Sequence, residues 1–145
     1  MMRLTNTWRA AALTMLLASC TQAAASPTDA VTDCASHSGE VAKRWGAVRT
    51  VSGAFAVQAL DVIAWQETRD AGKGIRPTSP LRRLNLPVTT PLLVCYYDGD
   101  FDHFPGKGHR PPYDRIVVII DGEGRYTIDS AGPSQYLHIE KPGAR

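Results

Sequence analysis

Apolar residues recur with helical spacing over residues 59–71. Leu60, Ile63 and Ala64 would share one face of a helix there, and Gly72 stands where a helix commonly ends. The pattern therefore predicts a helix over residues 59–71. We expect its face with these three apolar residues to contact the core.

Apolar runs in the second half of the chain have the length and composition of strands. Residues 92–97 form one such run, and Asp98 and Gly99 follow as turn residues. Residues 116–120 are apolar at every position, which predicts a central strand covered on both faces. The turn residues 121–124 lead into a further predicted strand over residues 125–129.

Weaker patterns occupy the rest of the chain. Residues 41–48 are compatible with a short helix, and the alternation over residues 51–57 predicts a strand that leads into the main helix. Residues 73–91 contain four of the ten prolines, which predicts a loop because proline blocks both ladders and helix interiors. A last edge strand is predicted over residues 135–140.

The order of these elements predicts an α+β fold with one main helix packed on a small antiparallel sheet of three to five strands. A small β-barrel is the alternative, favoured if residues 51–57 also join the sheet. We expect a single globular domain over residues 34–145, because about 110 residues suffice for one core.

The first 20 residues have the layout of a secretory signal. Arg3 and Arg9 precede an apolar stretch at residues 10–17, which is too short to cross a hydrocarbon core of about 30 Å. Two small residues then lead to Cys20. Residues 1–19 are therefore predicted to be a signal peptide.

The sequence Leu17-Ala18-Ser19-Cys20 resembles the lipobox of bacterial lipoprotein precursors. The resemblance implies that signal peptidase II cuts after Ser19 and that Cys20 receives a diacylglyceryl thioether. It also implies localisation at the cell membrane, with the protein lipid-anchored on the extracytoplasmic face and membrane lipid as the partner of the anchor. The alternative is an ordinary secretory signal cut within residues 21–26, in which Cys20 has no such role.

Residues 20–33 would then be the lipidated cysteine and a flexible tether, because residues 21–33 are mostly small and polar. Cys34 and Cys95 remain, and an exported domain with two cysteines most simply forms one disulfide. The competing interpretation is a zinc site made by Cys34, His37, Cys95 and another histidine. That set lacks the paired cysteine spacing of such sites.

The net charge of the chain argues against a nucleic-acid partner. The chain has 16 basic and 14 acidic residues, and Arg3 and Arg9 in the signal account for the difference. A chain that begins at Cys20 would be neutral by formal charge. Nucleic-acid binding needs a basic patch, so no nucleic-acid partner is expected.

The densest polar cluster contains Asp98, Asp100, Asp102 and His103, with His109 further along the same segment. Alternating aspartates resemble the start of an EF-hand loop, because carboxylate oxygens on a tight turn can surround calcium or another cation such as zinc. His103 stands where that loop needs glycine, and His109 stands where it needs a bidentate glutamate. The alternative is a solvated connection that binds no metal.

No catalytic residue is predicted. The sequence has no Gly-x-Ser-x-Gly, Ser-x-x-Lys, His-Glu-x-x-His or Cys-x-x-Cys motif and no phosphate-binding glycine loop. The sequence therefore predicts a membrane-anchored surface lipoprotein that acts as a non-enzymatic binding or accessory module of the cell envelope. Its partner would be an unknown envelope protein or glycan. The alternative is a small metal-dependent envelope enzyme that uses residues 98–109.

Aromatic residues suggest two binding surfaces. Trp45 and Trp65 would stack on carbohydrate or peptide if exposed, although Trp65 is expected to pack against the sheet. A second candidate is an exposed aromatic patch around the aspartate-rich segment. Its members would be Tyr96, Tyr97, Phe101 and Phe104.

Overall fold

The computed structural model describes residues 26–74, 79–104 and 113–144. The elements in chain order are α1 (Pro27–Ser36), α2 (Ser38–Trp45), β1 (Gly46–Gln58), α3 (Ala59–Gly72), the 3₁₀ helix η1 (Pro80–Leu84), β2 (Pro91–Phe101), β3 (Tyr113–Asp121) and β4 (Tyr126–Gly132). The four strands form one antiparallel sheet in the order β1-β2-β3-β4. The predicted α+β class is confirmed, and β1 and β4 lie at opposite ends of the strand order, as in an open sheet rather than the alternative barrel.

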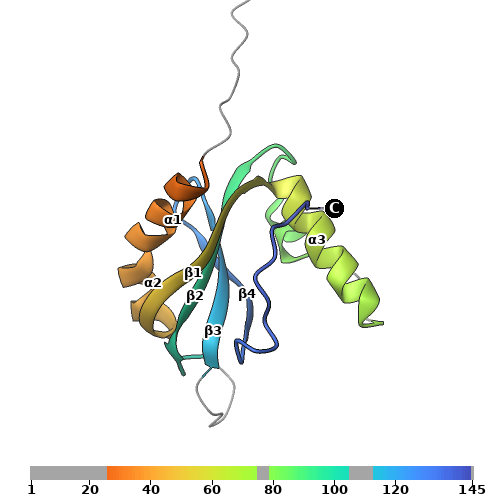
Figure 1. Ribbon diagram of the computed structural model, residues 1–145. Coiled ribbons are helices and arrows are strands. Elements are labelled where there is room, and N and C mark those ends of the chain that lie inside the picture. Colours follow the sequence, from red (N-terminus) through yellow and green to blue (C-terminus); the bar gives the residue numbers. More distant parts are fainter. Residues whose placement is uncertain (1–25, 75–78, 105–112, 145) are drawn as a thin grey trace, which may run out of the picture.

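Two layers cover the sheet, with α1 and α2 on one face and α3 on the other (Figure 1). Successive residues of a strand point to opposite faces, so Cys95 and Tyr97 of β2 pack toward α1 and α2, whereas Val94 and Tyr96 pack toward α3. Residues 116–120 of β3 are at most 2% exposed. The prediction of a central strand covered on both faces is therefore confirmed.

Helix α3 has the predicted bounds within one residue, but a different face is buried. Its buried residues are Ala59, Val62, Ile63 and Gln66, whereas Leu60 is 52% exposed. The expectation that Leu60 and Ala64 face the core is therefore wrong. The reason lies in the start of the helix, whose first N–H groups donate to the carbonyls of Thr90 and Val88. These bonds set the rotation of α3 as it leaves β1.

The folded chain begins earlier than the sequence predicted. Residues 27–33 of the predicted tether belong to α1, which places Ala30 and Cys34 in the core. Pro27 at the first helical turn and Asp29 near the N-terminus both favour a helix. The prediction that residues 27–33 form a tether is wrong, because Ala30 is small enough to pack closely against the sheet.

The N-terminal features of the sequence have no counterpart in the described part of the chain. The predicted signal peptide (residues 1–19), Cys20 and the first residues of the predicted tether all lie outside the described residues. In residues 26–74, 79–104 and 113–144, no helix has the length and apolar character to span a bilayer. Lipidation of Cys20 accordingly stays a prediction.

Strand β2 continues through Asp98 and Gly99, where the sequence predicted a turn. A Cβ atom on Gly99 would lie 2.0 Å from the carbonyl oxygen of Ala47, so only glycine lets β1 approach this closely. Gly46 on the facing strand has a φ of 128° and equally little room. This close pairing lengthens both strands, and β1 replaces the end of the helix predicted over residues 41–48.

The edge strand predicted over residues 135–140 is wrong. The carbonyl of Pro133 accepts hydrogen bonds from the N–H groups of Tyr136 (2.9 Å) and Leu137 (3.1 Å), which turns the chain. The chain after β4 then runs back between the sheet and α3 (Figure 1). Leu137 packs against the apolar cluster on that face.

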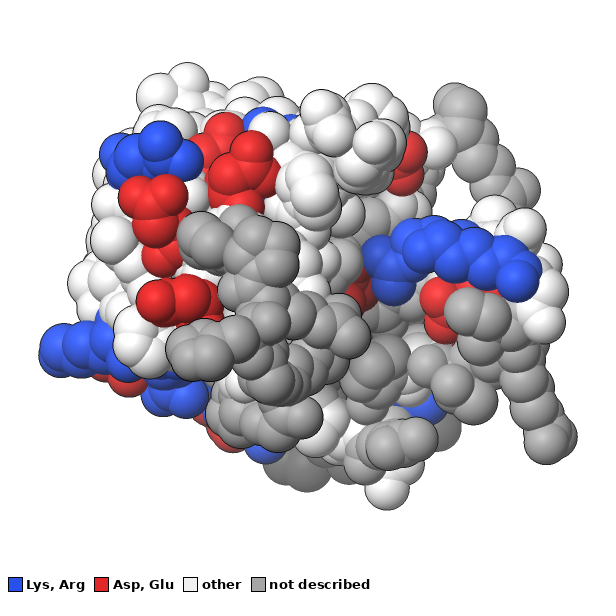
Figure 2. Space-filling view, turned by 90° about the horizontal axis from the view of Figure 1, so that it is seen from below, with Lys and Arg blue, Asp and Glu red and all other residues white. Residues whose placement is uncertain are grey.

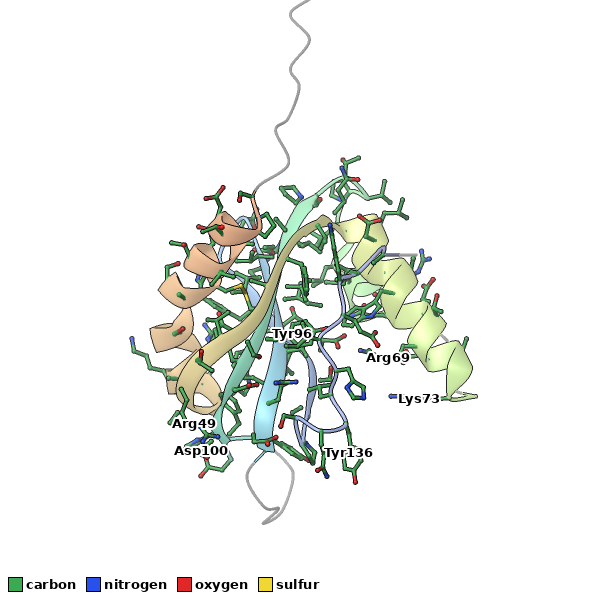
Figure 3. All side chains as sticks on the ribbon, viewed as in Figure 1. Arg49, Arg69, Lys73, Tyr96, Asp100 and Tyr136 are labelled. Atoms are coloured by element: carbon green, nitrogen blue, oxygen red, sulfur yellow. A yellow bond between two sulfur atoms is a disulfide. The ribbon has the colours of Figure 1, made fainter. Side chains whose placement is uncertain are left out.

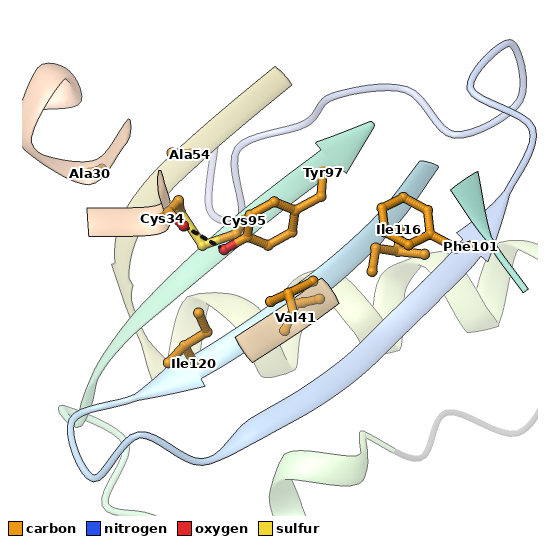
Figure 4. Close-up of a cluster of buried hydrophobic side chains, with 10 residues drawn as sticks. Ala30, Cys34, Val41, Ala54, Cys95, Tyr97, Phe101, Ile116 and Ile120 are labelled. Atoms are coloured by element: carbon orange, nitrogen blue, oxygen red, sulfur yellow. Dashed lines mark hydrogen bonds between the residues drawn. A yellow bond between two sulfur atoms is a disulfide. The ribbon is translucent and has the colours of Figure 1, made fainter. Parts of the chain in front are cut away.

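The predicted disulfide is confirmed and joins α1 to the middle of β2. Cys34 and Cys95 are both completely buried and lie 61 positions apart in the sequence. The hydroxyl of Tyr97 donates to the carbonyl of Cys34 at 2.7 Å beside the bridge (Figure 4). The alternative zinc site is therefore wrong, and Nδ1 of His37 instead lies 2.6 Å from the hydroxyl of Tyr126.

We expect the double substitution Cys34→Ala and Cys95→Ala to lower the free energy of unfolding by about 2–4 kcal/mol, because the bridge closes a long loop in the unfolded chain. Urea unfolding monitored by circular dichroism measures this change. The parent protein kept in reductant is the control and should match the variant. Equal midpoints for the oxidised and reduced parent would contradict the prediction.

Candidate functional site

The predicted metal ligands on β2 are engaged with basic residues. The carboxylate of Asp98 accepts hydrogen bonds from Arg115 at 2.6 and 2.9 Å and from Ser52 at 3.1 Å. The bonds from Arg115 hold the pKa of Asp98 below its ordinary value. Asp100 lies 3.6 Å from Arg49, and both of these side chains are exposed.

Asp102 and His103 lie beyond the end of β2 and contact each other. The Asp102 carboxylate is 2.6 Å from Nδ1 of His103, and His109 lies outside the described residues. Within the described ranges, no group of three His, Cys, Asp or Glu side chains is placed to hold a metal. The structure thus brings Asp102 and His103 together, while Asp98 and Asp100 each pair with a different arginine. The metal site over residues 98–109 stays a prediction.

The predicted exposed aromatic patch is wrong. Tyr96, Tyr97 and Phe101 are at most 1% exposed, because alternate positions of β2 enter the two apolar clusters. Phe104 is partly buried and packs edge-to-face on Tyr113 at 5.3 Å between ring centroids. The aromatic residues near the aspartates therefore build the core.

A hollow lies between α3 and the segment that follows β4. It consists of two adjoining parts, which we call the first and second hollows and together the α3 cleft. The first hollow has a volume of about 580 Å³ and lies between residues 61–68 of α3 and residues 140–144. The second has a volume of about 350 Å³, with Tyr96 and Val117 from the sheet among its lining residues.

Trp65 lines both hollows and stands where they adjoin. Its indole Nε1 donates to Oε2 of Glu140 at 3.2 Å, which links α3 to the C-terminal segment. The guanidinium carbon of Arg69 lies 5.0 Å from the centroid of the indole. Arg69 lines only the second hollow, so it contacts Trp65 from that side.

A buried polar network fixes the side of the second hollow. The side chain of Asp129 is 1% exposed and accepts hydrogen bonds from Arg69 at 2.6 and 3.2 Å, from Gln66 at 2.7 Å and from Ser130 at 2.6 Å. The hydroxyl of Ser79 donates to the other end of the Gln66 amide. The bonds with Asp129 raise the pKa of Arg69, which keeps its guanidinium charged and in place.

Tyr96 holds the C-terminal segment onto the sheet. Its hydroxyl donates to the carbonyl of Glu140 at 3.0 Å and accepts from the N–H of the same residue at 3.1 Å. Burial raises the pKa of Tyr96, so the phenol stays protonated and able to donate. Glu140 is thus bound by its backbone to β2 and by its side chain to α3.

Figure 3 shows how the cleft opens. Arg69 and Lys73 extend from α3 toward the sheet, where Tyr96 lies, and Tyr136 lies farther along the same opening. Arg49 and Asp100 lie on the opposite side of the sheet, away from the cleft. The arrangement combines an aromatic wall with donors and acceptors in fixed positions, which suits recognition of a polar ligand.

Charges of both signs lie next to one another on the surface. In the view from below, Lys and Arg side chains neighbour Asp and Glu side chains instead of forming one continuous basic area over the described residues (Figure 2). Ion pairs such as Arg49 with Asp100 bring charges of opposite sign together on the surface. This face therefore shows no basic patch of the kind that nucleic-acid binding needs.

Sequence reasoning named Trp65 but missed the rest of the cleft. Glu140 lies 75 positions from Trp65, and residues 135–140 were expected to form a strand. A sequence signal near this segment is Gly132-Pro133, a dipeptide typical of a turn. Comparison with known proteins gives no relative from which to infer a role, since no family model, no curated protein and no solved structure matches the chain.

We expect Asp98→Asn to lower the free energy of unfolding by about 1–2 kcal/mol at pH 7, because Arg115 loses a charged acceptor. The folded pKa of Asp98 is lowered, so its stabilising effect is present above its ordinary pKa and is lost as the pH falls through the folded pKa. The difference between parent and variant should therefore shrink below about pH 4. Urea unfolding at pH 7 and pH 3 measures both values.

Asp100→Asn is the matched control for this prediction. Its pair with Arg49 is exposed on both sides, so we expect a change within about 0.5 kcal/mol at pH 7. A variant at Asp98 that is as stable as the one at Asp100 would contradict the assigned role of the Asp98–Arg115 pair.

Proposed function

We propose that the protein is a lipid-anchored protein of the bacterial cell envelope and that its folded domain is a non-enzymatic binding module. The α3 cleft is its binding site. The observation that carries this proposal is the meeting of the two hollows at the hydrogen bond between Trp65 and Glu140. An aromatic ring with fixed polar neighbours in a concave site is the usual arrangement for holding a ligand.

The polar groups of the cleft are fixed before a ligand arrives. Asp129 and Gln66 orient Arg69 and each other, and Tyr96 fixes the backbone of Glu140. A site that is already ordered loses less conformational entropy on binding, which favours affinity. The polar side chains of the cleft hold one another in place through these hydrogen bonds. This geometry supports binding of a ligand rather than proton transfer.

Two features support an envelope location. The lipobox at residues 17–20 resembles that of lipoprotein precursors, and the buried disulfide is of a kind that forms and persists in oxidising compartments. Because α1 begins at Pro27, the chain from Cys20 to the first helix can extend at most about 25 Å. An anchored domain would therefore stay close to the lipid headgroups.

We expect Cys20→Ala to abolish incorporation of a fatty-acid analogue and to move the protein from the membrane fraction to the soluble fraction, because the thioether can form only on the cysteine. Metabolic labelling followed by fractionation measures both effects. Ser26→Ala lies outside the lipobox and should leave labelling unchanged. Labelling that persists without Cys20 would contradict the anchor.

We expect Trp65→Ala to weaken binding of the purified protein to insoluble bacterial peptidoglycan by about tenfold, as the removal of a central aromatic contact does in other binding sites. Co-sedimentation over a range of peptidoglycan concentrations measures this. Leu60→Ala is the matched control, because Leu60 is exposed on the same helix and lines neither hollow. Equal sedimentation of the parent and both variants would contradict the proposed site.

A further inference from the structure

We infer that the ligand of the α3 cleft is a neutral oligosaccharide at least two sugar rings long, with one ring in each hollow. This inference rests on the proposed binding function and names the chemistry of its ligand. It is carried by the shape of the cleft, the surroundings of Trp65 and the balance of charge along both hollows.

The shape of the cleft favours a ligand made of repeated units. The two hollows have volumes of about 580 and 350 Å³, so each is within the range of small-molecule sites. They adjoin at Trp65 and Glu140, which line both. A single ring would occupy only one hollow, whereas a linear ligand that crosses Trp65 would occupy the two together.

The surroundings of Trp65 favour a ring with an apolar face in the first hollow. Arg69 contacts the indole from the second hollow, and the residues beside Trp65 in the first hollow include the small Ala64 and Thr68. Gly143 and Ala144 line the same hollow from the C-terminal segment. Small neighbours leave the indole accessible, and a sugar ring presents an apolar C–H face that matches an aromatic surface.

The polar groups of the first hollow match hydroxyl groups. Asp61 and Glu140 supply carboxylate acceptors, and Lys141 supplies donors. The hydroxyl of Thr68 donates to the carbonyl of Ala64 at 2.8 Å, so its oxygen adds a further acceptor. Sugar hydroxyls also donate and accept, so they can use acceptors and donors that lie close together. A ligand that could only donate or only accept hydrogen bonds would leave some polar groups of the first hollow without a partner.

The charge balance along the cleft favours a neutral ligand. In the second hollow the guanidinium of Arg69 is bound to the buried carboxylate of Asp129, and Asp70 and Lys73 also line this hollow with opposite charges. The first hollow has two carboxylates and one ammonium group, so it too contains charges of both signs. A strongly charged ligand would meet repulsion at some of these groups, whereas a neutral polyhydroxyl ligand would not.

A substitution at Gly143 tests the first hollow independently of Trp65. Its φ is 80°, and a Cβ atom there would lie 3.0 Å from the carboxyl group of Asp61. A side chain at this position would press on that carboxylate at the wall of the hollow, and the positive φ would also strain the backbone there. The effect reaches one end of the cleft without changing Trp65.

The test titrates the purified full chain with three series of sugars, which we call ladders. They are β-1,4-linked N-acetylglucosamine, β-1,4-linked glucose and α-1,4-linked glucose, each supplied as monomer, dimer and tetramer. Calorimetry measures the affinities. At least one ladder should bind, with the dimer or tetramer about tenfold tighter than the monomer, because the longer sugars reach both hollows. Trp65→Ala should weaken this binding by about tenfold, Gly143→Ala should also weaken it, and Leu60→Ala should leave it unchanged.

Trp65→Phe is a second variant that we expect to stay folded, because it keeps an aromatic ring at this position. It removes only the indole N–H that donates to Glu140. It should retain the thermal transition of the parent and bind the longer sugars more weakly. Circular dichroism of every variant checks that the domain is folded before its affinity is compared. Full affinity in both Trp65 variants would overturn the inference.

Two further outcomes separate the inference from the proposed function. Equal affinity for monomer and tetramer, or no binding of any ladder up to about 10 mM, overturns the oligosaccharide inference. If peptidoglycan co-sedimentation then still depends on Trp65, the proposed function stands and the ligand is the peptide part of the polymer. If co-sedimentation is also insensitive to Trp65→Ala, both proposals fail.

Discussion

Strands β2 and β3 bury apolar side chains on both faces, so the sheet is stable only when two separate layers cover it. Helices α1 and α2 form one layer, and the disulfide between Cys34 and Cys95 ties that layer to the middle of β2. Helix α3 and the chain after β4 share the other face. The cleft exists because two elements, rather than one, complete this second layer.

The hydrogen bonds that join those two elements also give the cleft its chemistry. Glu140 bonds through its backbone to Tyr96 and through its side chain to Trp65. The buried Asp129 holds Arg69 beside the same indole. Residues that stabilise the second layer thus also line the proposed binding site, so cleft variants have to be compared with matched controls that report on folding.

The sequence predicted an element correctly where a short stretch of residues was compatible with only one kind of structure. The apolar run at residues 116–120 is a central strand, and the two cysteines form the predicted bridge. The prediction was wrong where a partner decided the outcome. Asp98 and Gly99 are residues typical of turns, yet the close approach of Ala47 on β1 makes Gly99 part of a strand. Leu60 fits a helical stripe, yet the bonds from the N–H groups of Ala59 and Leu60 to the loop before β2 turn it outward.

The sequence by itself determined the α+β class, the disulfide and the positions of the main helix and central strands, because these depend on periodicity and composition over a few residues. It also contains the four residues, 17–20, whose resemblance to a lipobox underlies the proposed anchor. Only the tertiary structure decided that Asp98 pairs with Arg115, that α1 begins at Pro27 and that Trp65 meets Glu140. The last contact joins residues 75 positions apart, and no local pattern determines which distant segment completes a layer.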